Sequence, residues 1–120
     1  MILKLFLTFI FFTCPFLFSQ KLLPQQKSRH EIIHHLGYSL SYNEQYEQAN
    51  WVYYELTKDE SFGSYPRKDR FKPDPNVRTN SAELSDYKGS GFDRGHLAPA
   101  ADMKWSERAM LESFYMSNMS

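Results

Sequence analysis

A short stretch late in the chain carries residue types that suit hydrolysis. Asp93, Arg94, Gly95 and His96 are adjacent, with glycines and a proline close by. The imidazole of a histidine has a pKa of about 6.5, so its neutral form can take a proton from water near neutral pH. An acid and a guanidinium beside it can orient a hydrated metal ion or hold a phosphate oxygen. From residue types alone, a hydrolytic site and an ordinary hydrogen-bonded turn both fit this stretch.

A basic cluster precedes this stretch. Residues 58–90 contain several glycines and prolines and few apolar side chains, which is typical of a loop. A loop of this length within a compact domain is usually functional. Its basic side chains suit contact with a phosphate backbone, although a solvated charged loop fits them equally well. The cluster comprises Arg67, Lys68, Arg70, Lys72 and Arg78, interrupted only by Asp69 and Asp74.

Strands and a helix must position these side chains. Residues 38–42 alternate aromatic or aliphatic residues with serine, which predicts a half-buried strand. Residues 51–57 are rich in aromatic and β-branched side chains and predict a second, antiparallel strand. We expect the aromatic face of this pair to pack in the core; stacking on nucleic-acid bases is the alternative. Residues 106–112 predict a helix with Ser106 as its N-cap.

Three histidines lie near the start of this region, at positions 30, 34 and 35. The neighbouring pair His34 and His35 suggests a metal site. However, adjacent side chains of a strand point to opposite faces of the sheet. We therefore expect these histidines on the surface or at a strand edge.

Composition limits the function classes. The chain has 120 residues, equal numbers of basic and acidic residues (14 each) and one cysteine. This length suffices for one domain. The zero net charge excludes a strongly cationic nucleic-acid coat protein, and a single cysteine excludes an internal disulfide framework. The aromatic content of 17% argues against a disordered chain.

The N-terminal segment has the pattern of an export signal. Lys4 precedes an apolar run over residues 5–18 that is shorter than the roughly 20 residues needed to span a bilayer. This predicts a signal peptide over residues 1–20, a linker over 21–36 and one domain over 37–120. We expect a secreted or periplasmic protein without stable membrane association after signal cleavage. An uncleaved anchor and a lipoprotein attached through Cys14 are the alternatives.

The run 93–96, with residues 86–92 before it and 97–103 after it, resembles the DNA/RNA non-specific endonucleases. This ββα-metal (His-Me finger) family includes the secreted Serratia-type nuclease and mitochondrial endonuclease G. Further similarities follow in order along the chain, at 38–42, 50–57, Arg67 with 71–75, and 114–118. The resemblance implies an α+β fold with an antiparallel sheet and flanking helices, and with residues 114–118 as a strand.

The same resemblance implies a mechanism. His96 would be the general base that deprotonates the attacking water. One divalent ion, Mg²⁺ or another such as Mn²⁺, would bind the scissile phosphate. Arg67, with Arg70 as second choice, would stabilise charge on the transition state. The residues expected near substrate, water or the hydrated metal are Asp93, Arg94, Arg70 and Asn118.

The resemblance also implies what lies further along. In the family, a helix that bears the metal-binding Asn follows the strand at 114–118, and we expect that ligand beyond Ser120. We therefore expect this chain to be a truncated fragment that is inactive or nearly so by itself. The substrates would be DNA and RNA alike, because phosphate and sugar contacts carry no sequence information. The alternative function is a non-catalytic exported module that binds nucleic acid or a partner through the basic loop.

Overall fold

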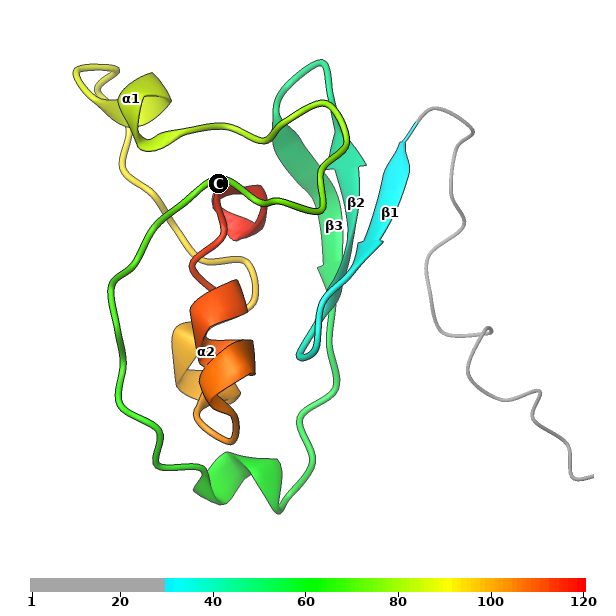
Figure 1. The fold of residues 1–120 in the computed structure, drawn as a ribbon, viewed down its shortest axis with the longest axis vertical. Coiled ribbons are helices and arrows are strands. Elements are labelled where there is room, and N and C mark those ends of the chain that lie inside the picture. The colour runs from blue at the N-terminus through cyan, green and yellow to red at the C-terminus, as the bar shows by residue number, and fades with distance from the viewer. Residues whose placement is uncertain (1–29) are drawn as a thin grey trace, which may run out of the picture.

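The computed structural model describes residues 30–120, and Figure 1 shows an antiparallel sheet beside short helices. The sheet has the order β1 (Glu31–His34), β2 (Ser39–Asn43), β3 (Gln48–Tyr53). The α-helices are α1 (Leu84–Tyr87) and α2 (Glu107–Glu112). The 3₁₀ turns are η1 (Glu60–Phe62), η2 (Ala100–Met103) and η3 (Met116–Asn118). This is the expected α+β architecture, and no helix in the described part of the chain is long and apolar enough to cross a membrane.

Strand β2 forms nearly where predicted, but as the central strand it is buried on both faces and is not half-buried, since Ser41 is also only 2% exposed. Tyr38, Leu40 and Tyr42 are all buried in the main core cluster. Strand β3 pairs with β2 as predicted, but it covers residues 48–53 instead of 51–57. The predicted strand fails after Tyr53 because the backbone N–H and the hydroxyl of Thr57 both donate to the carboxylate of Glu60 at 2.8 Å. These bonds turn the chain into η1.

Strand β1 lies within the segment 21–36, which the sequence analysis assigned to a linker. Ile33 is buried and pairs with Leu40 in the antiparallel register. Only four residues form this strand, and polar residues flank its two isoleucines, so the period-two pattern is too short to identify. The sheet therefore begins at Glu31.

The long 58–90 stretch is mostly irregular, as predicted, but η1 and α1 interrupt it. Helix α1 begins after Glu83, whose backbone N–H donates to the carboxylate of Asp86 at 2.7 Å. Figure 1 shows the stretch running from β3 down to η1 and then back up on the side of α2 that faces away from the sheet. Its backbone is fixed by hydrogen bonds from Tyr65 N–H to Lys104 O at 2.9 Å and from Met116 N–H to Lys72 O at 2.9 Å.

Helix α2 begins as predicted, because the hydroxyl of Ser106 accepts a hydrogen bond from the Ala109 N–H. The prediction of a strand at 114–118 is wrong. The chain forms the 3₁₀ turn η3 there, and only isolated bridges remain, between Lys72 and Tyr115 and between His96 and Met119. All three residues of η3 are buried, and Figure 1 shows η3 beyond the end of α2 and beside β3.

Candidate active site

The position of His96 is set by backbone pairing with the last residues of the chain. Gly95 N–H donates to Ser120 O and Ser120 N–H donates to Gly95 O, each at 2.9 Å. Leu97 N–H donates to Asn118 O at 2.9 Å. Antiparallel pairing of this kind fixes which face of the segment each side chain occupies. The His96 side chain is thereby directed toward aromatic rings from two other segments.

Asn118 supports this pairing from inside. Its side chain is fully buried; Oδ1 accepts from Ala98 N–H at 2.8 Å, and Nδ2 donates to Ala98 O and Ser113 O at 2.9 Å each. All the hydrogen-bonding groups of this amide are thus used within the protein. The substrate-binding role expected for Asn118 does not fit this burial. Its position instead joins the His96 segment to the end of α2.

Two phenylalanines gather the expected catalytic side chains. The rings of Phe71 and Phe114 meet edge to face with centroids 5.1 Å apart. The His96 ring lies edge-on to Phe114 at 4.8 Å and tilted to Phe71 at 6.0 Å. The guanidinium of Arg67 lies over Phe114 at 5.1 Å and that of Arg94 over Phe71 at 4.5 Å. These distances are typical of cation–π contacts, so one aromatic pair holds two arginines and the histidine together.

Sequence reasoning missed the role of Phe71 and Phe114. Both fall in segments matched to the family, but neither carries a group that titrates or donates a hydrogen bond. No periodic pattern indicates that two such distant rings meet. The signal in the sequence that could have indicated this role is the position of Phe71 within the basic cluster.

The surroundings of His96 favour its neutral form. The side chain is half-buried, and this burial lowers the pKa of His96 below its ordinary value of 6.5. The positive charge of Arg67 lowers the pKa of His96 further, whereas Asp69 acts in the opposite direction. Within residues 30–120 its buried Nε2 has no hydrogen-bond partner. A neutral imidazole with an unpartnered nitrogen is able to accept a proton.

Of the two candidate arginines, Arg67 is the better placed. Its Nε donates to Asp69 Oδ1 at 2.7 Å, and the two side chains are 55% and 64% exposed. An ion pair this exposed is weak, so the guanidinium can exchange Asp69 for a phosphate. Arg70 is exposed as well, but it is not among the charges that shift the pKa of His96.

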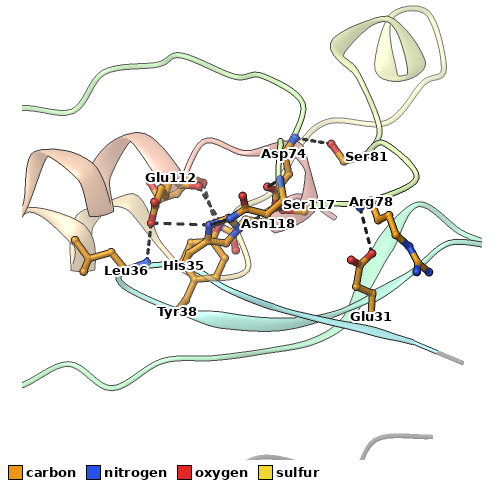
Figure 2. Close-up of polar contacts among 12 residues, drawn as sticks. Glu31, His35, Leu36, Tyr38, Asp74, Arg78, Ser81, Glu112, Ser117 and Asn118 are labelled. Atoms are coloured by element: carbon orange, nitrogen blue, oxygen red, sulfur yellow. Dashed lines mark hydrogen bonds and ion pairs between the residues drawn. The ribbon is translucent and has the colours of Figure 1, made fainter. Parts of the chain in front are cut away.

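The remaining basic side chains spread along the loop. Lys68 Nζ lies 5.5 Å from the Tyr65 ring centroid, and Lys72 Nζ lies 5.1 Å from that of Tyr115. Arg78 lies elsewhere, beside β1, where its backbone N–H donates to Glu31 (Figure 2). The loop therefore presents basic side chains from 67 to 72 near the site, without Arg78.

Carboxylates are sparse around His96. Asp93 is exposed and precedes Arg94, which is also exposed. Within residues 30–120 no three His, Cys, Asp or Glu side chains come together to hold a metal ion. The described residues therefore do not fit a complete metal site by themselves.

The prediction for His35 is wrong. Its side chain is fully buried, and Nε2 lies 2.8 Å from Asp74 Oδ2 (Figure 2). Ser117 Oγ donates to the same oxygen at 2.5 Å, and Glu112 Oε2 lies 3.9 Å from His35 Nδ1. This buried polar cluster of His35, Asp74, Glu112 and Ser117 joins β1, the loop, α2 and η3. Local sequence patterns do not indicate a partner for His35, because its neighbours in space come from distant segments.

Asp74 is held ionised in this cluster. Burial by itself raises the pKa of Asp74, but hydrogen bonds from His35, Ser117 and the backbone of Asn76 outweigh it and lower the pKa of Asp74 overall. The cluster thus fixes the loop that carries Arg67 and Phe71 against α2 and η3.

Comparison with known proteins gives consistent matches. A family model described as DNA/RNA non-specific endonuclease matches residues 18–120. Mitochondrial nuclease EXOG of Xenopus laevis is 44% identical over 87 residues, covering 71% of this chain and 24% of its own length. Mitochondrial endonuclease G of Homo sapiens is 40% identical over 99 residues, covering 81% of this chain and 31% of its own length. The chain spans about a quarter to a third of these curated relatives.

The structural comparison agrees. A crystal structure of an EndoG/EndoGI complex, described as showing the mechanism of EndoG inhibition, aligns with a TM-score of 0.66 at 30% identity. The alignment covers 74% of this chain and 38% of the other. Among the relatives, the frog and human proteins are named as mitochondrial. This finding overturns the expectation of a secreted or periplasmic protein; the segment 1–20 on which that expectation rested lies outside the described residues.

Proposed function

Because this chain belongs to the DNA/RNA non-specific endonuclease family, we propose that the protein hydrolyses phosphodiester bonds of DNA and RNA without sequence preference. The observation that carries this proposal is the meeting of Arg67, Arg94 and His96 around one aromatic pair. Since β1 is part of the sheet and the family model matches residues 18–120, we propose that the nuclease segment begins before residue 37.

In the proposed mechanism His96 is the general base. Its lowered pKa keeps the imidazole neutral near pH 7, so that it can accept the proton of an attacking water. Arg67 stabilises negative charge that develops on the phosphate, and Arg94 holds the phosphodiester. Asp93 orders water at the edge of the site. None of these groups reads a base edge, so cleavage does not depend on sequence.

The family resemblance further implies a divalent cation, Mg²⁺ or Mn²⁺. Mg²⁺ usually keeps several waters and is bound through few protein ligands together with substrate phosphates. We propose that activity requires such a cation. Chelation by EDTA is expected to abolish cleavage, and added Mg²⁺ to restore it. Cleavage that continues in EDTA would contradict this requirement.

The test of the proposal is His96→Ala in the full-length protein, assayed on plasmid DNA and on RNA with Mg²⁺. Loss of the general base is expected to reduce the rate by roughly 10²–10⁴-fold while nucleic-acid binding is kept. His34→Ala is the matched control, because His34 is exposed on β1 and, among the described residues, its side chain is hydrogen-bonded to Ser39. Full cleavage by the His96 variant would remove this residue from the mechanism.

A further inference from the structure

An exposed aromatic ring stands directly before the catalytic stretch. The ring of Phe92 is 78% exposed, although large aromatic side chains usually gain from burial. The turn that carries it is well defined. Gly89 and Gly91 have φ angles of 76° and 84°, a region that favours glycine. The hydroxyl of Ser90 donates to Tyr87 O at 2.8 Å and accepts from Phe92 N–H at 3.1 Å.

Phe92 borders a hollow of about 360 Å³. The lining residues are Leu84, Tyr87, Lys88, Phe92, Asp93 and Arg94. Its size falls within the range of small-molecule sites, about 300–1,000 Å³. Arg94 connects the hollow with the candidate active site, because it lines the hollow and its guanidinium lies over the Phe71 ring.

The lining combines two kinds of recognition. Phe92 and Tyr87 offer aromatic faces, on which bases of any sequence can stack. Lys88 and Arg94 add positive charge on the same rim, which suits a phosphate. An unpaired nucleotide has both parts, a flat base and a charged phosphate. A peptide or lipid partner with only an apolar surface leaves the two cations without a role.

Resting on the proposed function, we propose that this hollow binds an unpaired base next to the scissile phosphate, with the base stacked on Phe92. Lys88 contacts the flanking phosphate, while Arg94 lies between the hollow and the phosphodiester that it holds. The subsite gives the enzyme a preference for single-stranded or locally opened substrate, because a base within a duplex is already paired and stacked.

The experiment measures binding without cleavage. The full-length protein is titrated, in EDTA, into a single-stranded oligonucleotide that carries 2-aminopurine, whose fluorescence falls on stacking. Phe92→Ala is expected to weaken binding roughly tenfold and to remove the fluorescence decrease, since one base–aromatic stack has about that effect. Phe92→Tyr is expected to restore both. Phe62→Ala is the matched control, because Phe62 is 75% exposed and belongs to η1. η1 lies at the opposite end of the molecule from α1 (Figure 1).

Substrate variants complete the test. On a duplex, Phe92→Ala and the wild type are expected to bind alike. On oligonucleotides short enough to allow a single binding register, each with one abasic position, the difference between the two proteins is expected to vanish at a single position. Equal binding of Phe92→Ala and wild type to every single strand would overturn the subsite. So would a lowered melting temperature of Phe92→Ala with an equal loss on all substrates, because the ring would then be a packing residue.

Failure of this inference is distinct from failure of the proposed function. If Phe92→Ala binds normally while His96→Ala loses cleavage, the subsite is wrong and the nuclease stands. If His96→Ala cleaves normally while the fluorescence still falls with wild type and not with Phe92→Ala, the subsite stands and the catalytic assignment is wrong.

Discussion

His96 shows how a single residue is adapted to act as a base. Its ring is surrounded by the edges and faces of Phe71 and Phe114, and a guanidinium lies nearby. Burial of the ring away from water, and then the positive charge of Arg67, disfavour protonation, so the pKa of His96 falls. Asp69 weakens the effect of Arg67 by pairing with it. The same arginine that would stabilise the transition state therefore also adjusts the base.

This double role predicts a change in the pH profile of Arg67→Gln. A base with a lowered pKa stays neutral to lower pH, so activity falls only as the pH drops through that pKa. Without Arg67 the pKa of His96 rises, and the acid limb of kcat/KM moves to higher pH. The rate is expected to fall as well, by roughly 10²–10³-fold. Arg70→Gln is the control; its acid limb should stay in place, and an equal shift in both variants would contradict the role of Arg67.

Asn118 leads to a prediction about stability. In Asn118→Ala, the buried N–H and C=O of Ala98 and the C=O of Ser113 lose their partner. Unpaired buried groups cost about 1–3 kcal/mol each, so for three such groups we expect unfolding by urea to show a loss of at least about 3 kcal/mol. Asn50→Ala, at an exposed site with one hydrogen bond to Asn43, is expected to lose less than about 1 kcal/mol. Equal losses in the two variants would contradict the structural role of Asn118.

At the scale of elements, the buried polar cluster connects four segments that are distant in the sequence. His35 follows β1, Asp74 lies in the loop, Glu112 ends α2 and Ser117 lies in η3 (Figure 2). Glu112 also accepts from the Leu36 N–H at 2.7 Å, and its backbone carbonyl accepts from the Tyr38 hydroxyl at 2.8 Å. The elements that carry Arg67, Phe71 and Phe114 are thus tied to the sheet at one point.

This cluster predicts acid sensitivity. Because the pKa of Asp74 is lowered in the folded state, its contribution to stability is complete above its unfolded pKa, at about pH 4. The contribution is lost as the pH falls below that value, through the folded pKa. Asp74→Asn is expected to lose about 3 kcal/mol at pH 7 and to depend less on pH between 4 and 2, measured by urea unfolding at each pH. Glu83→Gln, an exposed control, should keep the wild-type dependence.

The elements also show what can be predicted from sequence. Strand β2 and helix α2 follow local rules, alternation and an N-cap, and both were found. Strand β1 and the position of His35 depend on partners distant in sequence, Leu40 and Asp74, so local patterns could not reveal them. The family resemblance placed His96, Arg67 and Arg94 in one site. The aromatic pair that brings them together became visible only in three dimensions.

At the scale of the whole molecule, charged residues are unevenly distributed, but basic and acidic residues are equal in number. The chain has 14 basic and 14 acidic residues, so long-range attraction to a polyanion is weak. The exposed cations near the site are Arg67, Arg70, Lys72, Lys88 and Arg94. Binding must then depend on these local contacts, each of which displaces counterions from the nucleic acid.

The last prediction follows from this distribution. The affinity of the full-length protein for single-stranded DNA, measured in EDTA, should fall linearly on a plot of log affinity against log salt concentration. Neutralising one phosphate contact, as in Arg70→Gln, should reduce the magnitude of that slope by roughly one and weaken binding equally across sequences. Lys58→Gln removes an equal charge just before η1, and η1 lies at the opposite end of the molecule from α1 (Figure 1). This variant should lower the affinity little and leave the slope unchanged. If both variants change the slope equally, the affinity depends on the total charge of the protein, and the loop does not contact the phosphates specifically. If neither changes it, phosphate contacts lie outside the loop altogether.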